Sequence, residues 1–291
     1  MERLSESGEE ESVLQNHAAY FVEFAETAEP YLTSGQRDSW LRKLEAEIDN
    51  IRMVLSHSLK CRIDPIFGIR LAGTLGWFWH LRGYLTEGRN WASSLMKLPE
   101  ASERTRARAK VLFPAGGLAW SQGDYRIGNA ILKESASIFK EVGDLRGLTD
   151  ARGILAGGLA SLGEYDKAQA LCEDTVALLR QSGDRWGLAF ILYWLGSIIL
   201  VKTGDTKAVR VMFEEILALS KELQDSWLHA EALNHLGVVN GMQGDYEVAQ
   251  SYFEASIAYH ETTGDRWAIA RSLSGFGEVM LRQGNYDGAK S

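Results

Sequence analysis

The chain has few cysteines and no excess of positive charge. Only Cys61 and Cys172 occur among its 291 residues, too few and too far apart for a disulfide framework, which fits a reducing compartment. Lysine and arginine number 31 against 39 aspartates and glutamates, so the formal net charge is −8. An acidic chain is a poor partner for phosphate backbones or anionic membrane surfaces. Binding to nucleic acid or to a membrane is therefore not expected.

The sequence also lacks a signal peptide and a long apolar run. Residues 1–11 are polar and acidic, unlike the basic start and apolar core of a secretory signal. The longest uncharged run lies between Arg185 and Lys202, and its 16 residues are fewer than the roughly 20 that a membrane-spanning helix needs. We therefore expect a buried repeat helix at this run and a cytoplasmic location for the chain.

Catalytic and metal-binding motifs are missing as well. None of the six histidines has a histidine four residues away with an intervening acid, and no serine or cysteine nucleophile motif occurs. Residues 284–291 resemble a phosphate-binding loop superficially, but Ala289 separates Gly288 from Lys290, where a Walker loop requires adjacent glycine and lysine. The sequence therefore predicts no enzyme activity, no cofactor and no metal site.

What the sequence does contain is a repeated turn. Six related turns recur, at Gly83-Tyr84, Gly123-Asp124-Tyr125, Gly163-Glu164-Tyr165, Gly204-Asp205-Thr206, Gly244-Asp245-Tyr246 and Gly284-Asn285-Tyr286. Their spacing is 40 residues, with one interval of 41. A fixed period in this range is typical of a stacked repeat array, in which each repeat buries its apolar side on its neighbours.

Each repeat is predicted to contain two helices of about 17 residues. A second set of turns separates the repeats, at Gly143-Asp144, Gly183-Asp184, Gln224-Asp225 and Gly264-Asp265. Glycine supplies the left-handed residue that ends one helix, and aspartate caps the next. Small residues recur at fixed places in the first helices (Gly76, Gly116, Ala156, Gly196, Gly237, Gly277) and second helices (Gly88, Gly128, Ala168, Ala208, Ala249, Ala289). They predict closely packed helices, and no strand-like alternation competes with this pattern.

Residues 1–60 are predicted to form a helical segment before the array, which occupies residues 61–291. Helices are expected over 12–29 and 36–60, packed on the first repeat, and a further helix should run from Asp64 to Gly83. The last repeat stops about one turn into its second helix. Since solenoids normally end in a polar cap, we expect a truncated repeat whose apolar face, residues 266–283, self-associates or frays.

These small and large apolar columns resemble the tetratricopeptide repeat (TPR) over about residues 64–291. The resemblance implies an all-α, right-handed superhelical solenoid of TPR-like helix-turn-helix repeats. The period of about 40 departs from the usual 34, which means helices about one turn longer. Pro114 inside a first helix predicts a kink there.

The opening residues resemble a second family. Several segments match the junction after the winged helix in bacterial multidomain signal-transduction ATPases, many of them transcriptional regulators: His17-Ala18-Ala19-Tyr20-Phe21, Leu44-Glu45-Ala46-Glu47, Asp49-Asn50-Ile51-Arg52 and Trp77-Phe78-Trp79. In that family a nucleotide-binding switch precedes a TPR-like sensor. The resemblance implies that this chain is the non-catalytic sensor region. The alternative is a free-standing TPR scaffold that assembles protein partners.

The concave face of such a superhelix is the predicted binding surface. Counted from the small-residue column, it carries Arg70, Trp77, His80, Lys110, Phe113, Trp120, Asp150, Phe190, Tyr193, Glu231, Asn234, Arg271 and Glu278. Large aromatic rings beside charges suit a groove for a protein, a peptide or a small-molecule effector. The alternative is that these rings only fill a tightly wound superhelix. A clamp for a free peptide carboxylate is not supported, because only Lys110 and Asn234 fall suitably.

Two further sets of residues have a structural interpretation. Trp186, Trp227 and Trp267 start successive first helices, where a ring wedges between adjacent repeats. The run Arg104, Arg106, Arg108 and Lys110 alternates along the sequence, which scatters its side chains around a helix and favours an exposed face over an anion site.

Overall fold

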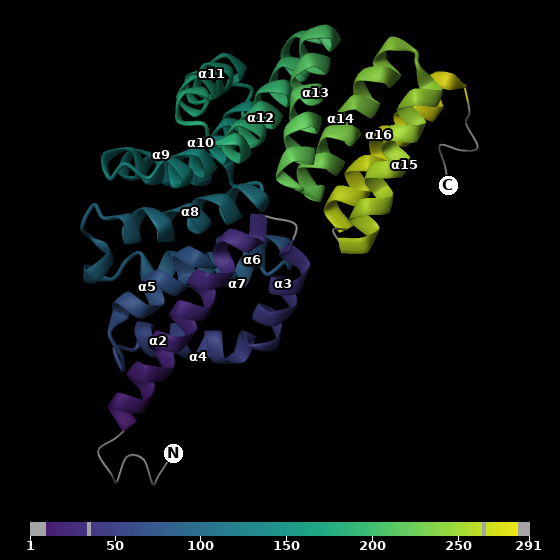
Figure 1. Ribbon diagram of the computed structural model, residues 1–291. Helices are drawn as coiled ribbons and strands as arrows, with labels where there is room; N and C mark the ends of the chain where they lie inside the picture. Colours follow the sequence, from purple (N-terminus) through teal and green to yellow (C-terminus); the bar gives the residue numbers. More distant parts are fainter. Residues whose placement is uncertain (1–9, 34–35, 264–265, 285–291) are drawn as a thin grey trace. The chain divides into compact units, whose positions relative to one another are not determined.

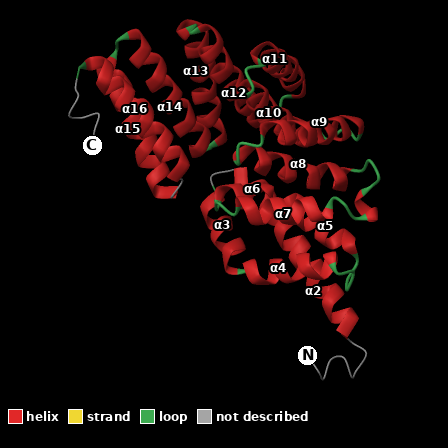
Figure 2. Ribbon diagram, turned by 180° about the vertical axis from the view of Figure 1, so that it is seen from behind, coloured by secondary structure: helices red, strands yellow, loops and turns green. Residues whose placement is uncertain are grey.

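The computed structural model describes residues 10–33, 36–263 and 266–284, which are helices joined by short loops with no β-strand among them (Figures 1 and 2). The elements are α2 (Glu10–Ala28), the 3-10 helix η1 (Glu29–Thr33), α3 (Arg37–Ala46), α4 (Ile48–Leu59), α5 (Pro65–Thr74), α6 (Gly76–Leu81), α7 (Leu85–Leu95), the 3-10 helix η2 (Pro99–Ala101), α8 (Arg106–Ser121), α9 (Tyr125–Glu141), α10 (Leu145–Ser161), α11 (Tyr165–Ser182), α12 (Arg185–Thr203), α13 (Thr206–Leu223), α14 (Ser226–Gln243), α15 (Tyr246–Thr263) and α16 (Arg266–Gln283). The predicted all-α repeat fold is confirmed.

The chain divides into two compact units, Met1–Leu162 (unit 1) and Gly163–Ser291 (unit 2). The predicted boundary near residue 60 lies inside unit 1 and stays a prediction. The predicted turn at Gly264-Asp265 and the start of a further helix after residue 284 lie outside the described residues.

Unit 1 is built from the N-terminal helices and the first repeats. Helices α2 and α4 pack on α5, α5 packs on α7 and α8, and α9 lies between α8 and α10. Leu44 and Ile51 from the N-terminal segment and Phe78 and Trp79 from the first repeat are fully buried in one continuous core. The first repeat is therefore covered by residues that precede it in the sequence.

The predicted lengths of three helices in unit 1 were wrong. The helix expected over 36–60 is broken at Glu47 (ψ 12°), and the one expected from Asp64 to Gly83 is broken at Leu75 (ψ 9°). Leu75 stands between Gly73 and Gly76, where helix propensity is low. Helix α7 has 11 residues because the chain leaves it for η2, which starts at a proline. By contrast, α8 continues through Pro114.

The repeat turns have the predicted conformation. Glycines 83, 123, 143, 163, 183, 204, 244 and 284 all have positive φ, between 67° and 88°, and Gln224 takes the same left-handed region with φ 52°. Asp144, Asp184 and Asp225 then accept hydrogen bonds from backbone N–H groups in the first turn of the next helix. Each dipeptide therefore ends one helix and caps the next.

The small-residue columns also act as predicted, by letting helices approach closely. A Cβ on Gly128 would lie 2.8 Å from the carbonyl oxygen of Gly116, and one on Gly88 would lie 2.4 Å from the Trp79 ring. In unit 2, Cβ atoms on Gly196 and Gly237 would meet the rings of two buried phenylalanines at 2.8 and 3.0 Å. Close packing offsets the helix propensity that glycine loses, about 1 kcal/mol each.

Unit 2 repeats a simple packing scheme. Each helix contacts the next one from α11 to α16, and the first helices α12, α14 and α16 also contact one another in that order. Helix α12 has the length and composition of a membrane span, with a mean hydropathy of 1.6. Its residues Phe190, Ile191 and Leu192 are buried inside the unit, so α12 is a core helix of the repeat, as predicted.

Candidate functional site

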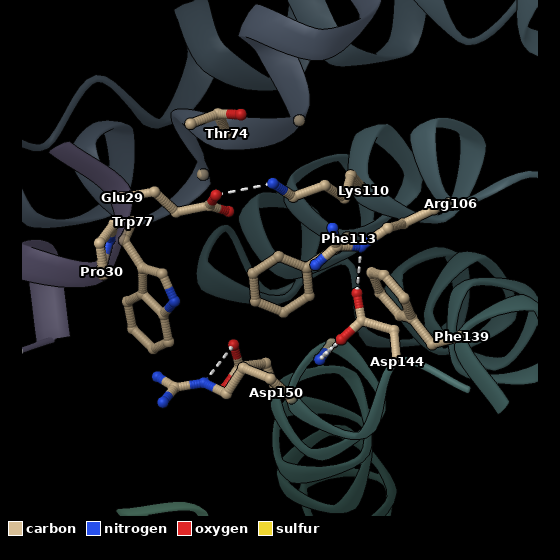
Figure 3. A pocket seen from close by; sticks show the side chains of 14 residues that line it. Glu29, Pro30, Thr74, Trp77, Arg106, Lys110, Phe113, Phe139, Asp144 and Asp150 are labelled. Atoms are coloured by element: carbon tan, nitrogen blue, oxygen red, sulfur yellow. Dashed lines mark hydrogen bonds and ion pairs between the residues drawn. The ribbon is translucent and has the colours of Figure 1, made fainter. Parts of the chain in front are cut away.

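Unit 1 contains a cavity of about 250 Å³ whose walls come from η1, α5, α6, α8, α9 and α10 (Figure 3). Its lining combines three aromatic rings (Trp77, Phe113, Phe139), three cations (Arg106, Lys110, Arg146) and three carboxylates (Glu29, Asp144, Asp150), together with Pro30, Thr74, Gly73, Gly76 and Gly147. We call this site the unit 1 cavity.

Aromatic rings form the apolar part of the cavity. Trp77 and Phe113 are half-buried, with ring centroids 6.3 Å apart and planes tilted by 52°. Glycines bring the backbone close to these rings: a Cβ on Gly147 would lie 2.4 Å from Phe139, and one on Gly76 would lie 3.6 Å from Phe113. A partly exposed aromatic surface of this kind is suited to contact with an apolar group.

Each carboxylate of the cavity accepts a hydrogen bond from one of its cations (Figure 3). Lys110 Nζ lies 2.7 Å from Glu29 Oε2, Arg106 Nε lies 2.6 Å from Asp144 Oδ2, and Arg146 Nε lies 3.2 Å from Asp150 Oδ2. Asp144 also caps α10 by accepting from the Gly147 N–H at 3.0 Å. The hydrogen bond to Asp144 raises the pKa of Arg106, so this guanidinium stays charged.

Unit 2 contains a buried polar cluster. Arg271 Nη1 on α16 donates to Tyr193 Oη on α12 at 2.8 Å, and its Nη2 donates to Glu231 on α14. His260 Nε2 on α15 lies 3.5 Å from Glu231 Oε1. We call these four residues the Arg271 cluster. Only 2% of the Glu231 side chain and none of the His260 side chain is exposed, and burial raises the pKa of Tyr193 to about 12.

Comparison with known proteins agrees with this geometry. A family model described as tetratricopeptide repeat matches residues 228–291, and no curated protein sequence matches the chain. The fold is TPR-like. The apo form of RapI superposes with a TM-score of 0.68 at 15% identity, covering 92% of this chain and 93% of that chain.

Two other solved structures share this TPR-like fold. A Rap protein complexed with Competence and Sporulation Factor gives a TM-score of 0.66 at 14% identity, over 97% of this chain and 95% of that chain. The Rap conjugation gene regulator of plasmid pLS20, in complex with the Phr* peptide, superposes with a TM-score of 0.64 at 14% identity, covering 93% of this chain and 82% of that chain. At these identities the likeness shows the fold alone.

Four of the residues predicted for the concave face in unit 1 come together. Trp77, Lys110 and Phe113 line the unit 1 cavity, as does Asp150. The others lie apart from it: Arg70 pairs with Glu26 at 2.8 Å, the His80 ring lies 3.1 Å from the Ser121 hydroxyl, and Trp120 packs beside Tyr125.

Most of the residues predicted for unit 2 are buried, and three of them are bonded to one another. Phe190 and Asn234 are 1% and 3% exposed, and Tyr193, Glu231 and Arg271 belong to the Arg271 cluster. Glu278 lies at the surface, paired with Arg282 at 2.7 Å. Tyr193, Glu231 and Arg271 are thus engaged with one another, and the choice between a groove and packed rings stays a prediction for this unit.

Several cavity residues carried no clear signal in the sequence. Glu29 comes from the N-terminal segment, 81 residues before its partner Lys110. Phe139 lies near the end of α9, the second helix of its repeat. Asp144 was interpreted only as a cap. Arg106 was interpreted as part of an exposed run, although its position four residues before Lys110 on one helix was a usable signal.

Other predictions have partial outcomes. Trp186 is buried between repeats and donates its Nε1 hydrogen to Asp225 at 2.9 Å, while Trp227 is half-buried beside Tyr193. Trp267 lies outside the described side chains. Leu273 and Leu281 on α16 are 52% and 53% exposed, and self-association through residues 266–283 stays a prediction. No group of three or more potential metal ligands occurs within the described ranges.

Proposed function

We propose that this chain is a non-catalytic sensor that binds a peptide or protein segment, with the unit 1 cavity as the anchoring site. The observation that carries the proposal is the cavity itself, in which Trp77, Lys110 and Phe113 converge. Aromatic side chains beside charged groups can hold both the apolar and the polar part of a ligand. Tyr193, Glu231 and Arg271, which were predicted for the binding face in unit 2, are bonded to one another, and this favours unit 1 as the place for a ligand.

The size of the cavity favours binding of one ligand side chain over enclosure of a whole peptide. A volume of 250 Å³ equals about eight water molecules at about 30 Å³ each, which suits one large side chain. A peptide would place one residue in the cavity and leave the rest of its chain on the surface. The solved complex of the Rap conjugation gene regulator with the Phr* peptide gives a precedent for peptide recognition on this fold.

The regulatory setting of the sensor is proposed from the junction motifs in residues 17–79. They favour a cytoplasmic, TPR-like sensor region of a bacterial regulatory ATPase of the transcriptional regulator type. Ligand binding would be linked to the switch domain through the N-terminal segment, because Glu29 of η1 forms both a wall of the cavity and the ion pair with Lys110. Sequencing of the complete reading frame tests this setting, since it requires a nucleotide-binding domain upstream.

A free-standing scaffold is the second candidate. It is favoured by one observation: the match to the Rap protein bound to Competence and Sporulation Factor spans 95% of that chain. In that structure a similar arrangement of helices therefore makes up almost the whole chain, without a large additional domain. Absence of a nucleotide-binding domain from the complete reading frame would favour this candidate over the sensor.

The proposed ligand site is tested by peptide selection from a displayed random library. Peptides selected on the 291-residue chain should lose binding to the Phe113→Ala variant. Loss of a central aromatic contact costs about 2 kcal/mol or more, roughly a 30-fold weaker affinity. Ile127→Ala is the matched control, because Ile127 is 53% exposed on α9 of the same unit and does not line the cavity. Unchanged binding by Phe113→Ala with normal helix content would refute the proposed site.

A further inference from the structure

The unit 1 cavity has unused hydrogen-bond donors on its cations. A guanidinium has five N–H donors, and among the described residues Arg106 uses one of them, its Nε hydrogen to Asp144. An ammonium has three donors, and Lys110 uses one, to Glu29. The two terminal amino groups of Arg106 and two hydrogens of Lys110 are therefore left for another acceptor.

Each carboxylate of the cavity is already engaged by at least one donor. Asp144 is engaged twice, by Arg106 and by the cap of α10, and Asp150 accepts from Arg146. Glu29 has one oxygen beyond the one that accepts from Lys110. The three carboxylates balance the three cations in charge, so the case for a further acceptor depends on the position of the Arg106 terminal amino groups beside the aromatic rings. A ligand carboxylate would supply acceptors for these donors.

The unused donors lie on one side of the aromatic surface. Arg106 and Lys110 are four residues apart on α8, so their side chains share one face of the helix. Phe113 follows three residues after Lys110 on the same helix, and Figure 3 shows its ring between the Arg106 guanidinium and Trp77. A planar guanidinium binds a carboxylate through two parallel N–H bonds.

From this geometry we infer that the unit 1 cavity recognises an aromatic carboxylate, with its ring against Trp77 and Phe113 and its carboxylate on the terminal amino groups of Arg106. This inference rests on the proposed function of the cavity and names the chemistry of its ligand. The volume of 250 Å³ accommodates one ring with its carboxylate. Two sources share this chemistry: the C-terminal aromatic residue of a peptide, and a small aromatic acid.

Two probes of nearly identical shape test the charge requirement. N-acetyl-phenylalanine carries a carboxylate, and N-acetyl-phenylalaninamide replaces it with a neutral amide. Dissociation constants are measured by ligand-observed NMR titration against the 291-residue chain. We expect the acid to bind about three- to tenfold more tightly than the amide, a moderate preference because the Arg106 side chain is 66% exposed.

Variants assign that preference to Arg106. Arg106→Gln should remove the difference between acid and amide while the affinity for the amide stays unchanged. Arg104→Gln is the matched control, since Arg104 is an exposed neighbour that pairs with Glu141 and lies outside the cavity, and it should keep the preference. Circular dichroism verifies that both variants retain the helix content of the parent chain.

A third probe, 3-phenylpropionate, distinguishes the two sources. Affinity equal to that of N-acetyl-phenylalanine supports a small aromatic acid, and much weaker affinity supports a peptide terminus. Equal binding of acid and amide, a preference that survives Arg106→Gln, or no binding of either probe at millimolar concentration would overturn the inference. If library peptides still depend on Phe113 in that case, the proposed ligand site stands and only the aromatic carboxylate is wrong.

Discussion

Replacement of Arg271 tests whether the Arg271 cluster stabilises unit 2. Arg271→Met keeps the apolar stem and removes the charge that faces Glu231, whose side chain is 2% exposed. Removing one partner of a buried ion pair costs about 3–5 kcal/mol, and here it leaves the buried Glu231 carboxylate with only His260, at 3.5 Å, beside it. The lower end, about 3 kcal/mol, applies here since 24% of the Arg271 side chain is exposed.

The effect should appear in local amide hydrogen exchange of α12, α14 and α16, the helices that the Arg271 cluster joins. A loss of about 3 kcal/mol speeds exchange through unit 2 by about 100-fold. Arg282→Met is the matched control on the same helix: its pair with Glu278 has side chains 50% and 64% exposed, so it should change exchange by less than fivefold, about 1 kcal/mol.

A double variant separates the lost ion pair from other effects of the substitution. Glu231→Gln combined with Arg271→Met removes the buried charge together with its partner and should be more stable than Arg271→Met alone. Two results would refute the reasoning: exchange in Arg271→Met as slow as in the parent chain, or a double variant that exchanges faster than the single one.

Two further predictions concern buried groups of the repeats. Burial lowers the pKa of His235 to about 4. The unfolded chain therefore binds a proton at this residue near pH 6.5, whereas the folded chain binds it only near pH 4. Stability should be full above pH 6.5 and fall by up to about 3 kcal/mol towards pH 4, a slope that His235→Gln reduces in urea titrations. Gly88→Ala should lose about 1–3 kcal/mol because the new Cβ meets Trp79, whereas Gly117→Ala, with open space there, should gain about 1 kcal/mol. An unfolding midpoint that moves the same way in both glycine variants would contradict this account.

Much of the fold follows from local signals in the sequence. The glycine turns at a spacing of about 40 residues predicted the helix ends, and the positive φ at glycines such as Gly123 and Gly204 confirms them. These positions are predictable because a left-handed residue that ends a helix has few alternatives to glycine. The breaks at Glu47 and Leu75 were not predictable in this way, since neither has a proline or a turn motif.

The candidate site followed less directly from the sequence. Repeat alignment placed Trp77, Lys110 and Phe113 on one face, and these residues do line the unit 1 cavity. The same alignment gave equal weight to Tyr193 and Arg271, which bond to each other inside unit 2. The repeat alignment predicts which face of its helix a residue occupies. It does not predict whether that face is open to solvent or covered, because this depends on the side chains of the other helices.

The sequence by itself therefore determined most of the helices from α8 onward, the period of the repeats and the close contacts at small residues, since these depend on neighbours within one helix hairpin. The tertiary structure decided that Glu29 meets Lys110 across 81 residues and that Arg106 stands at the edge of an aromatic cavity. It also decided that Glu231 and Arg271 pair inside unit 2. Such contacts depend on the distance and rotation between helices of different repeats, which no periodic pattern along a chain specifies.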